Sequence, residues 1–110
     1  MTLNEYQVAA QRTSNTKNQA EKIDNALLGL SGEVGELCDA MKKHLFQGHQ
    51  FDHNQMVREA GDVLWYIAEL ACGLGVTLDE IACCNIEKLR ARYPDGFNRE
   101  KSMHRMDGDI

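Results

Sequence analysis

The chain has 110 residues, of which 17 are acidic and 12 are lysine or arginine, and its formal net charge is −5. This length suits one domain with a thin hydrophobic core, which a second subunit would help to complete. The basic residues form no long block, which argues against a protein that binds nucleic acid polymers through their phosphates. No stretch approaches the roughly 20 apolar residues of a transmembrane helix, and the first residues lack signal-peptide features. We therefore expect a cytoplasmic protein without a membrane partner.

The four cysteines are Cys38, Cys72, Cys83 and Cys84. Their spacing matches neither a zinc site nor a simple disulfide framework. Free cysteine within a helix usually behaves as a small buried hydrophobe. The sequence therefore predicts reduced structural thiols, as is usual in the cytosol.

Capping residues and apolar periodicity predict four helices and no strands, which makes the fold class all-α. The predicted helices cover about 2–12, 23–46, 52–73 and 77–93. Residues 95–110 are polar and contain glycine, so we expect a C-terminal arm or tail there. The prediction is one domain over residues 1–110, with a helical core at about 3–93.

The third predicted helix is apolar nearly all round from Val63 to Leu74, and only Glu69 interrupts it. A helix of this kind is covered on most of its sides. Three other helices of one small chain can hardly cover it alone. We therefore predict a homodimer or a tetramer built as a dimer of dimers.

Two pairs of carboxylates stand at i, i+3 spacing on consecutive predicted helices: Glu33 with Glu36, and Glu59 with Asp62. This spacing places each pair on one helix face, and at about 100° per residue both pairs lie beside the apolar stripe. Helices packed through their stripes would bring all four acids to one edge. Only Asp62 has a nearby base, Arg58, in the less favourable order. The acids therefore indicate a bound cation, and oxygen ligands favour Mg²⁺ or Mn²⁺.

Two interpretations of these acids stay open from the residues alone, because E-x-x-E pairs are also common on solvated helix faces. Gly29, Gly32, Gly35 and Gly61 interrupt the same helices, at a cost of roughly 0.5–1 kcal/mol each against alanine. They indicate either close helix packing or room for a ligand. His44, His49 and His53 cluster around the second loop, and we favour a solvated loop over a metal contact there.

At this point the chain resembles the MazG-like family of all-α nucleoside triphosphate pyrophosphohydrolases. The family signature is E-x-x-E, a gap, and E-x-x-D, and here it reads Glu33 to Glu36 and Glu59 to Asp62. The surrounding strings LSGEVGEL and REAGDVLWYIAEL are similar to the family's metal-binding helices. A third string, NIEKLRARYPDGF, is similar to the helix end and turn of its short, single-domain members.

The resemblance implies a four- to five-helix bundle in which dimerisation completes the active site. It implies Mg²⁺, with Mn²⁺ as a substitute, held by Glu33, Glu36, Glu59 and Asp62. It also implies hydrolysis of a (deoxy)nucleoside triphosphate to the monophosphate and pyrophosphate, which clears surplus or non-standard nucleotides. A carboxylate that the metal does not saturate can act as general base, and we choose Glu36 for this role.

The substrate-binding residues are also implied by the resemblance. Matches to the family string N-x-x-K-L-x-x-R-Y-P are Asn85, Lys88, Arg92 and Tyr93. Tyr66, one turn after Asp62, is placed to touch the sugar or base. We assign Trp65 to a subunit interface, and the N-terminal helix with Gln7 and Gln11 is a candidate lid.

Two other functions compete with this one. A di-iron carboxylate bundle needs Glu-x-x-His on two helices, and the third residues after Glu33 and Glu59 are Glu36 and Asp62. A non-catalytic helical interaction module would leave the acids solvated, and it predicts no Mg²⁺ binding. Binding of magnesium is therefore the observation that separates the enzyme from the module.

Overall fold

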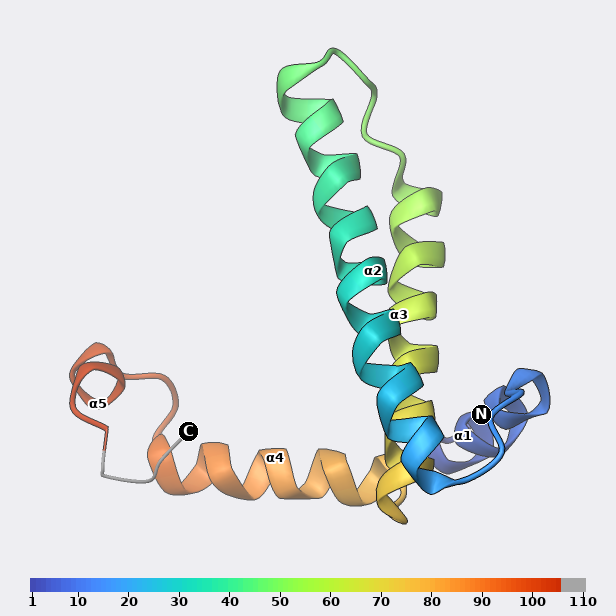
Figure 1. Cartoon of the computed structure of the whole chain (residues 1–110). Coiled ribbons are helices and arrows are strands. Elements are labelled where there is room, and N and C mark those ends of the chain that lie inside the picture. Colours follow the sequence, from blue (N-terminus) through green and yellow to red (C-terminus); the bar gives the residue numbers. More distant parts are fainter. Residues whose placement is uncertain (106–110) are drawn as a thin grey trace. The chain divides into compact units, whose positions relative to one another are not determined.

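The computed structural model describes residues 1–105, and all regular structure in that part is helical (Figure 1). This confirms the all-α fold class. The chain divides into two compact units, Met1–Leu78 and Asp79–Ile110, which are described separately. That residues 1–110 form one domain stays a prediction. The elements are α1 (Leu3–Ala10), the 3₁₀ turn η1 (Gln11–Thr13), α2 (Gln19–Phe46), α3 (His53–Leu74), α4 (Leu78–Arg92) and α5 (Arg99–Met103).

Side-chain caps set the beginnings of the first three helices. Thr2 and Glu5 form a capping box at the start of α1, and Asp52 caps α3, so both helices begin where the sequence predicts. The start of α2 was predicted too late, because the polar residues after Lys17 were assigned to the loop. Asn18 accepts a hydrogen bond from the backbone N–H of Glu21 and so begins the helix at Gln19.

The C-terminal segment is more regular than predicted. Asn98 accepts a hydrogen bond from the backbone N–H of Lys101 and begins the short helix α5 within the expected arm. Residues 106–110 of that arm lie outside the described residues. Helix α3 runs slightly beyond its predicted end at residue 73, because Gly75 is the C-cap, with a left-handed φ of 71°, and Gly73 lies inside the helix.

Helices α2 and α3 run antiparallel side by side, and α1 packs against α3 (Figure 1). The buried apolar side chains of the unit Met1–Leu78 are small except for one leucine: Ala10, Ala26, Ala68, Ala71 and Leu78. Small residues at a contact allow helix backbones to approach closely. Many large apolar side chains therefore lie outside the core, and Leu28 and Phe46 are 77% and 80% exposed.

Two glycines lie where another part of the chain closely approaches the helix backbone, and three others lie beside open space. A Cβ at Gly29 would overlap the ring of Tyr66, and one at Gly73 would lie 2.8 Å from Cγ1 of Ile23. Close packing is therefore the right interpretation for Gly29. Added Cβ atoms at the other three glycines of the acidic helices would meet nothing within 4 Å, so these are not contact points among residues 1–105: Gly32, Gly35 and Gly61.

We expect Gly29→Ala to lower the free energy of unfolding by about 1–3 kcal/mol, because the ring of Tyr66 must move to admit the methyl group. Gly32→Ala is the matched control on the same helix. It faces open space and should raise the free energy of unfolding by about 0.5–1 kcal/mol through helix propensity. Urea unfolding curves of both variants measure the difference, and equal stabilities would refute the Gly29–Tyr66 contact.

The N-terminal helix is anchored rather than free. Gln7 is buried, its amide donates to the carbonyl of Val76 at 3.0 Å, and its side-chain oxygen accepts from the N–H of Leu78 at 2.7 Å. The indole N–H of Trp65 lies 3.0 Å from the carbonyl of Ala10 and 2.9 Å from the hydroxyl of Thr13. Gln7 therefore fastens α1 to the residues that follow α3, and Trp65 makes its polar contacts within the chain; the lid role of the N-terminal helix stays a prediction.

All four cysteines are free, which agrees with the prediction of thiols. Cys38, Cys83 and Cys84 are exposed, however, so the buried role predicted for them is wrong. Each lies on a helix face that the described chain leaves open. Residues 1–105 contain no helix with the length and apolar character that a membrane crossing requires.

Candidate metal centre

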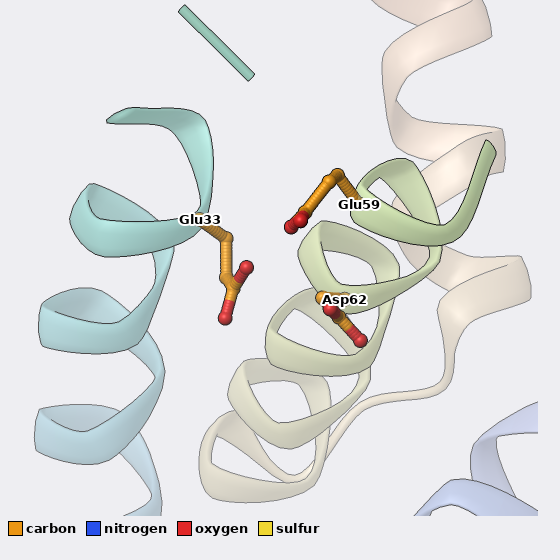
Figure 2. A group of neighbouring side chains, drawn as sticks. All are labelled: Glu33, Glu59 and Asp62. Carbon is orange, nitrogen blue, oxygen red and sulfur yellow. The ribbon is translucent and has the colours of Figure 1, made fainter. Parts of the chain in front are cut away.

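Three of the four predicted carboxylates converge between the two long helices (Figure 2). Glu33 projects from α2, and Glu59 and Asp62 project from successive turns of α3. Each offers one oxygen, and these oxygens lie within 4.8 Å of one another. The i, i+3 spacing places the α3 pair on one face, and the packing of α2 on α3 brings Glu33 to it.

The surroundings of these carboxylates leave their negative charge uncompensated. Glu33 and Glu59 are partly buried, and the Oε2 atom of each is buried without a hydrogen-bond partner among the described residues. No lysine or arginine in residues 1–105 forms an ion pair with them or with Asp62. Buried, unpaired carboxylate oxygens are costly unless a cation satisfies them. The donor set fits a hard divalent cation that prefers oxygen, such as Mg²⁺ or Mn²⁺.

Glu36 lies beside this group rather than in it. Its side chain is exposed, and a hydrogen bond with Glu59 followed by the charge of Glu59 raises its pKa, with smaller contributions from burial and from Asp62. Two neighbouring carboxylates that raise a pKa in this way share a proton more readily than isolated ones. Glu36 therefore contacts the centre through Glu59 and keeps an exposed oxygen-bearing group next to it.

Two hollows open on either side of the carboxylates. The first, which we call the aromatic hollow, has a volume of about 350 Å³ and is lined by Thr13, Glu33, Asp62, Trp65 and Tyr66. The second, the polar hollow, has a volume of about 390 Å³ and is lined by Glu36, Asp39, Ala40, Lys43, His49, Gln50, Gln55 and Glu59. The centre thus separates an aromatic space from a polar one.

The aromatic hollow contains residues that the sequence identified and others that it missed. Tyr66 lines it as predicted and packs edge-to-face on Trp65, with ring centroids 5.0 Å apart. Thr13 was missed because it lies far from the motif and reaches the hollow only through the fold. Tyr6 of α1 is not part of the hollow's lining, but it was missed too; burial, and then the charge of Asp62, raise the pKa of its phenol.

The loop histidines contribute no cluster with metal-ligand geometry in residues 1–105. His49 lines the polar hollow, and its carbonyl lies 2.9 Å from Nδ1 of His44. His53 is exposed at the start of α3. The solvated role that we favoured for these histidines stays a prediction.

The other predicted substrate residues belong to the second unit. Asn85 and Lys88 are exposed on α4, one turn apart. The guanidinium of Arg92 lies 5.9 Å from the ring centroid of Tyr93, which in turn packs on Phe97 with centroids 5.4 Å apart. The role of these residues in substrate binding stays a prediction.

Comparison with known proteins agrees with the carboxylate motif. Residues 21–97 match the model of the MazG nucleotide pyrophosphohydrolase domain. The chain belongs to the MazG nucleotide pyrophosphohydrolase family. It is also similar to the Gene 37 protein of Mycobacterium phage L5, with 33% identity over 100 residues that cover 83% of this chain and 88% of the relative. No solved structure matches the chain.

The match to the MazG domain includes both acid pairs and also the α4 string from Asn85 to Phe97. It therefore confirms the predicted family. It also removes support for the di-iron alternative, because no histidine joins the three converging carboxylates among the described residues.

Proposed function

We propose that the chain hydrolyses a (deoxy)nucleoside triphosphate to the nucleoside monophosphate and pyrophosphate in a reaction that depends on Mg²⁺. The observation that carries the proposal is the convergence of Glu33, Glu59 and Asp62, two of which hold buried oxygens without a partner. In a member of a nucleotide pyrophosphohydrolase family, the expected ligand of such a site is a divalent cation that also binds the substrate phosphates. An acidic protein can receive a polyanionic triphosphate when metal cations neutralise both sides.

The residues divide the chemistry between them. Glu33, Glu59 and Asp62 would hold Mg²⁺, or Mn²⁺ as a substitute, and Glu36 would complete the set through its contact with Glu59. When bound, the metal neutralises phosphate charge and polarises a phosphoryl oxygen. Glu36 is exposed and has a raised pKa, so it is suited to accept the proton of the attacking water. One water is consumed, the link between the first and second phosphates breaks, and pyrophosphate leaves.

Substrate contacts complete the proposal. Tyr66 lines the aromatic hollow and would touch the sugar or base. The family string on α4 and after it supports contacts to substrate by Asn85, Lys88, Arg92 and Tyr93. As a cytosolic enzyme of this kind, the protein would clear surplus or non-standard nucleotides from the pool and would need no nucleic acid polymer.

The proposed assembly is a homodimer or a dimer of dimers. It is supported by large apolar side chains that α2 and α3 leave exposed, including Leu27, Leu28, Val34, Leu45, Phe46 and Val57. Exposed apolar surface on this scale is typical of an interface. We expect sedimentation equilibrium at micromolar concentration to give twice or four times the 12.4 kDa mass of one chain. A monomer would contradict the assembly.

The activity itself is tested by pyrophosphate release from a panel of nucleoside triphosphates, with and without Mg²⁺. We expect release only with the metal, and loss of release in Glu36→Gln. Asp24→Asn is the control, because Asp24 is an exposed acid on the same helix. Metal-independent activity, or full activity of Glu36→Gln, would refute the mechanism. An inactive chain with no thermal shift in Mg²⁺ plus nucleotide would favour the non-catalytic interaction module.

A further inference from the structure

A second acidic group lies buried outside the metal centre. Glu69 of α3 is fully buried, and its carboxylate accepts hydrogen bonds from four side chains. The donors lie between 2.9 and 3.4 Å from its oxygens and are Gln11, Ser14, Asn25 and Lys22. A carboxylate with this many donors is satisfied in a buried position.

These bonds attach one stretch of chain to the helix pair. Gln11 and Ser14 belong to the segment from Gln11 to Thr16, which joins α1 to α2 and which we call the 11–16 segment. The ammonium group of Lys22 adds contacts to that segment, at 2.8 Å from Oε1 of Gln11 and 3.0 Å from the hydroxyl of Thr16. Glu69 and Lys22 therefore hold the 11–16 segment against α2 and α3, and we call these two residues the clamp.

The clamped segment forms part of the aromatic hollow. Thr13 lies between the two residues that Glu69 holds, and it lines the hollow together with Glu33 and Asp62. Glu69 follows Asp62 by seven residues, which is two helical turns, so both face the same side of α3. The single helix α3 thus carries both Asp62 of the metal centre and Glu69, which anchors the segment that contains Thr13.

The hollow has the chemistry of a nucleoside site rather than a phosphate site. Away from the carboxylates, its lining consists of two aromatic rings and the Thr13 hydroxyl, without a lysine or arginine. Aromatic rings and a hydroxyl suit an uncharged base and sugar. Lys22, the cation of the clamp, already forms an ion pair with Glu69.

We propose that Glu69 is a positioning residue, which holds the 11–16 segment as the wall of the aromatic hollow and so tightens binding of the nucleoside part of the substrate. The inference rests on the proposed function. Well-packed hydrophobic side chains in place of the whole buried network would often cost no stability. The carboxylate differs in that it orients donors from two separate parts of the chain.

A pair of single substitutions separates this role from simple stabilisation. Ser14→Ala removes a donor to Glu69 on the 11–16 segment. Asn25→Ala removes a donor to Glu69 on α2, and both hydrogen bonds are 2.9 Å long. Both substitutions should lower the melting temperature. We expect only Ser14→Ala to raise KM for the nucleoside triphosphate, by about three- to tenfold, which corresponds to one hydrogen bond. Its kcat should change little, since it leaves the carboxylates in place.

Two further measurements sharpen the comparison. Inorganic triphosphate with Mg²⁺ lacks a nucleoside, so its inhibition constant should be the same for the native chain and Ser14→Ala. Trypsin should cut after Arg12, within the 11–16 segment, and after Lys17, directly behind it, faster in Ser14→Ala and Glu69→Gln than in Asn25→Ala. The rate of trypsin cleavage can be measured whether or not the protein hydrolyses nucleotides. In a Glu69→Gln background, Ser14→Ala should raise KM by less than it does in the native chain, because the hydrogen bond to an uncharged amide oxygen is weaker.

The outcomes for the two proposals are distinct. An active native chain whose KM is unchanged in Ser14→Ala, or changed equally in Asn25→Ala, overturns the positioning role and leaves the proposed function standing. A native chain that hydrolyses no nucleoside triphosphate overturns the proposed function, and the nucleoside role with it. A raised KM confined to Ser14→Ala and Glu69→Gln, with unchanged inhibition by inorganic triphosphate, supports the inference.

Discussion

Glu59→Gln is expected to lower kcat/KM for a nucleoside triphosphate by about a hundred- to a thousandfold, the range typical for loss of one electrostatic partner in a catalytic site. Glu59 is the central acid, because it converges with Glu33 and Asp62 and also raises the pKa of Glu36. Glutamine keeps its shape but removes a negative charge from the metal ligands. Steady-state pyrophosphate release measures the loss.

The same variant has a stability signature that an unfolded protein would not show. Without metal, Glu59→Gln should be at least as stable as the native chain, because it relieves repulsion with Glu36 and Asp62. With Mg²⁺, the native chain should gain melting temperature and the variant should not. Asp24→Asn should behave like the native chain in both conditions. Retention of the Mg²⁺ shift in Glu59→Gln would contradict the metal site.

Glu69→Ala is expected to lower the free energy of unfolding by about 3–5 kcal/mol, the usual cost of removing one partner from a buried charged network. Lys22 loses its ion-pair partner, and the donors on Gln11, Ser14 and Asn25 lose their acceptor. Small domains have total stabilities of roughly 5–15 kcal/mol, so the variant should be marginal. Urea denaturation followed by circular dichroism measures the change.

Asp39→Ala is the matched control for that loss. Asp39 also pairs with lysines, Lys42 and Lys43, but its side chain is 45% exposed. Exposed ion pairs contribute little, so the free energy of unfolding should hardly change. Equal losses in Asp39→Ala and Glu69→Ala would show that burial of the network does not matter.

The pH dependence of stability provides a second check on Glu69. Burial by itself would raise its pKa, but hydrogen bonds from Gln11, Asn25 and Ser14 and the charge of Lys22 outweigh burial and lower it. The unfolded chain therefore takes up this proton at a higher pH than the native chain does. The stabilisation is complete above the ordinary glutamate pKa and is lost as the pH falls through the lowered native value. Glu69→Gln should lack this part of the acid dependence.

The helices and their caps could be predicted because they depend on contacts within a few residues. Thr2 and Asp52 cap their helices through bonds to residues three positions later, which local patterns reveal. The exception, the start of α2, was missed because Asn18 lies in a polar stretch without an apolar signal. The i, i+3 spacing likewise predicted that Glu59 and Asp62 share one face.

The role of Glu69 could not be predicted in the same way. In the sequence it is a single acid that interrupts an apolar helix, and it contributed only to the prediction of a dimer. Its partners, Gln11 and Asn25, are 58 and 44 residues away along the chain. No local pattern marks a contact of that separation, so only the fold identifies Glu69 as a buried anchor.

The sequence by itself determined the helical class, the two acid pairs and the family, since each follows from short-range spacing or from a motif. The tertiary structure decided that Glu33, Glu59 and Asp62 converge while Glu36 stands beside them. It also decided which glycines are contact points, because an added Cβ at Gly29 would overlap Tyr66 while one at Gly32, Gly35 or Gly61 would meet nothing within 4 Å. The physical reason is that these features depend on how α2 packs against α3. Small residues spread over both helices set that packing, and no single segment of the chain encodes it.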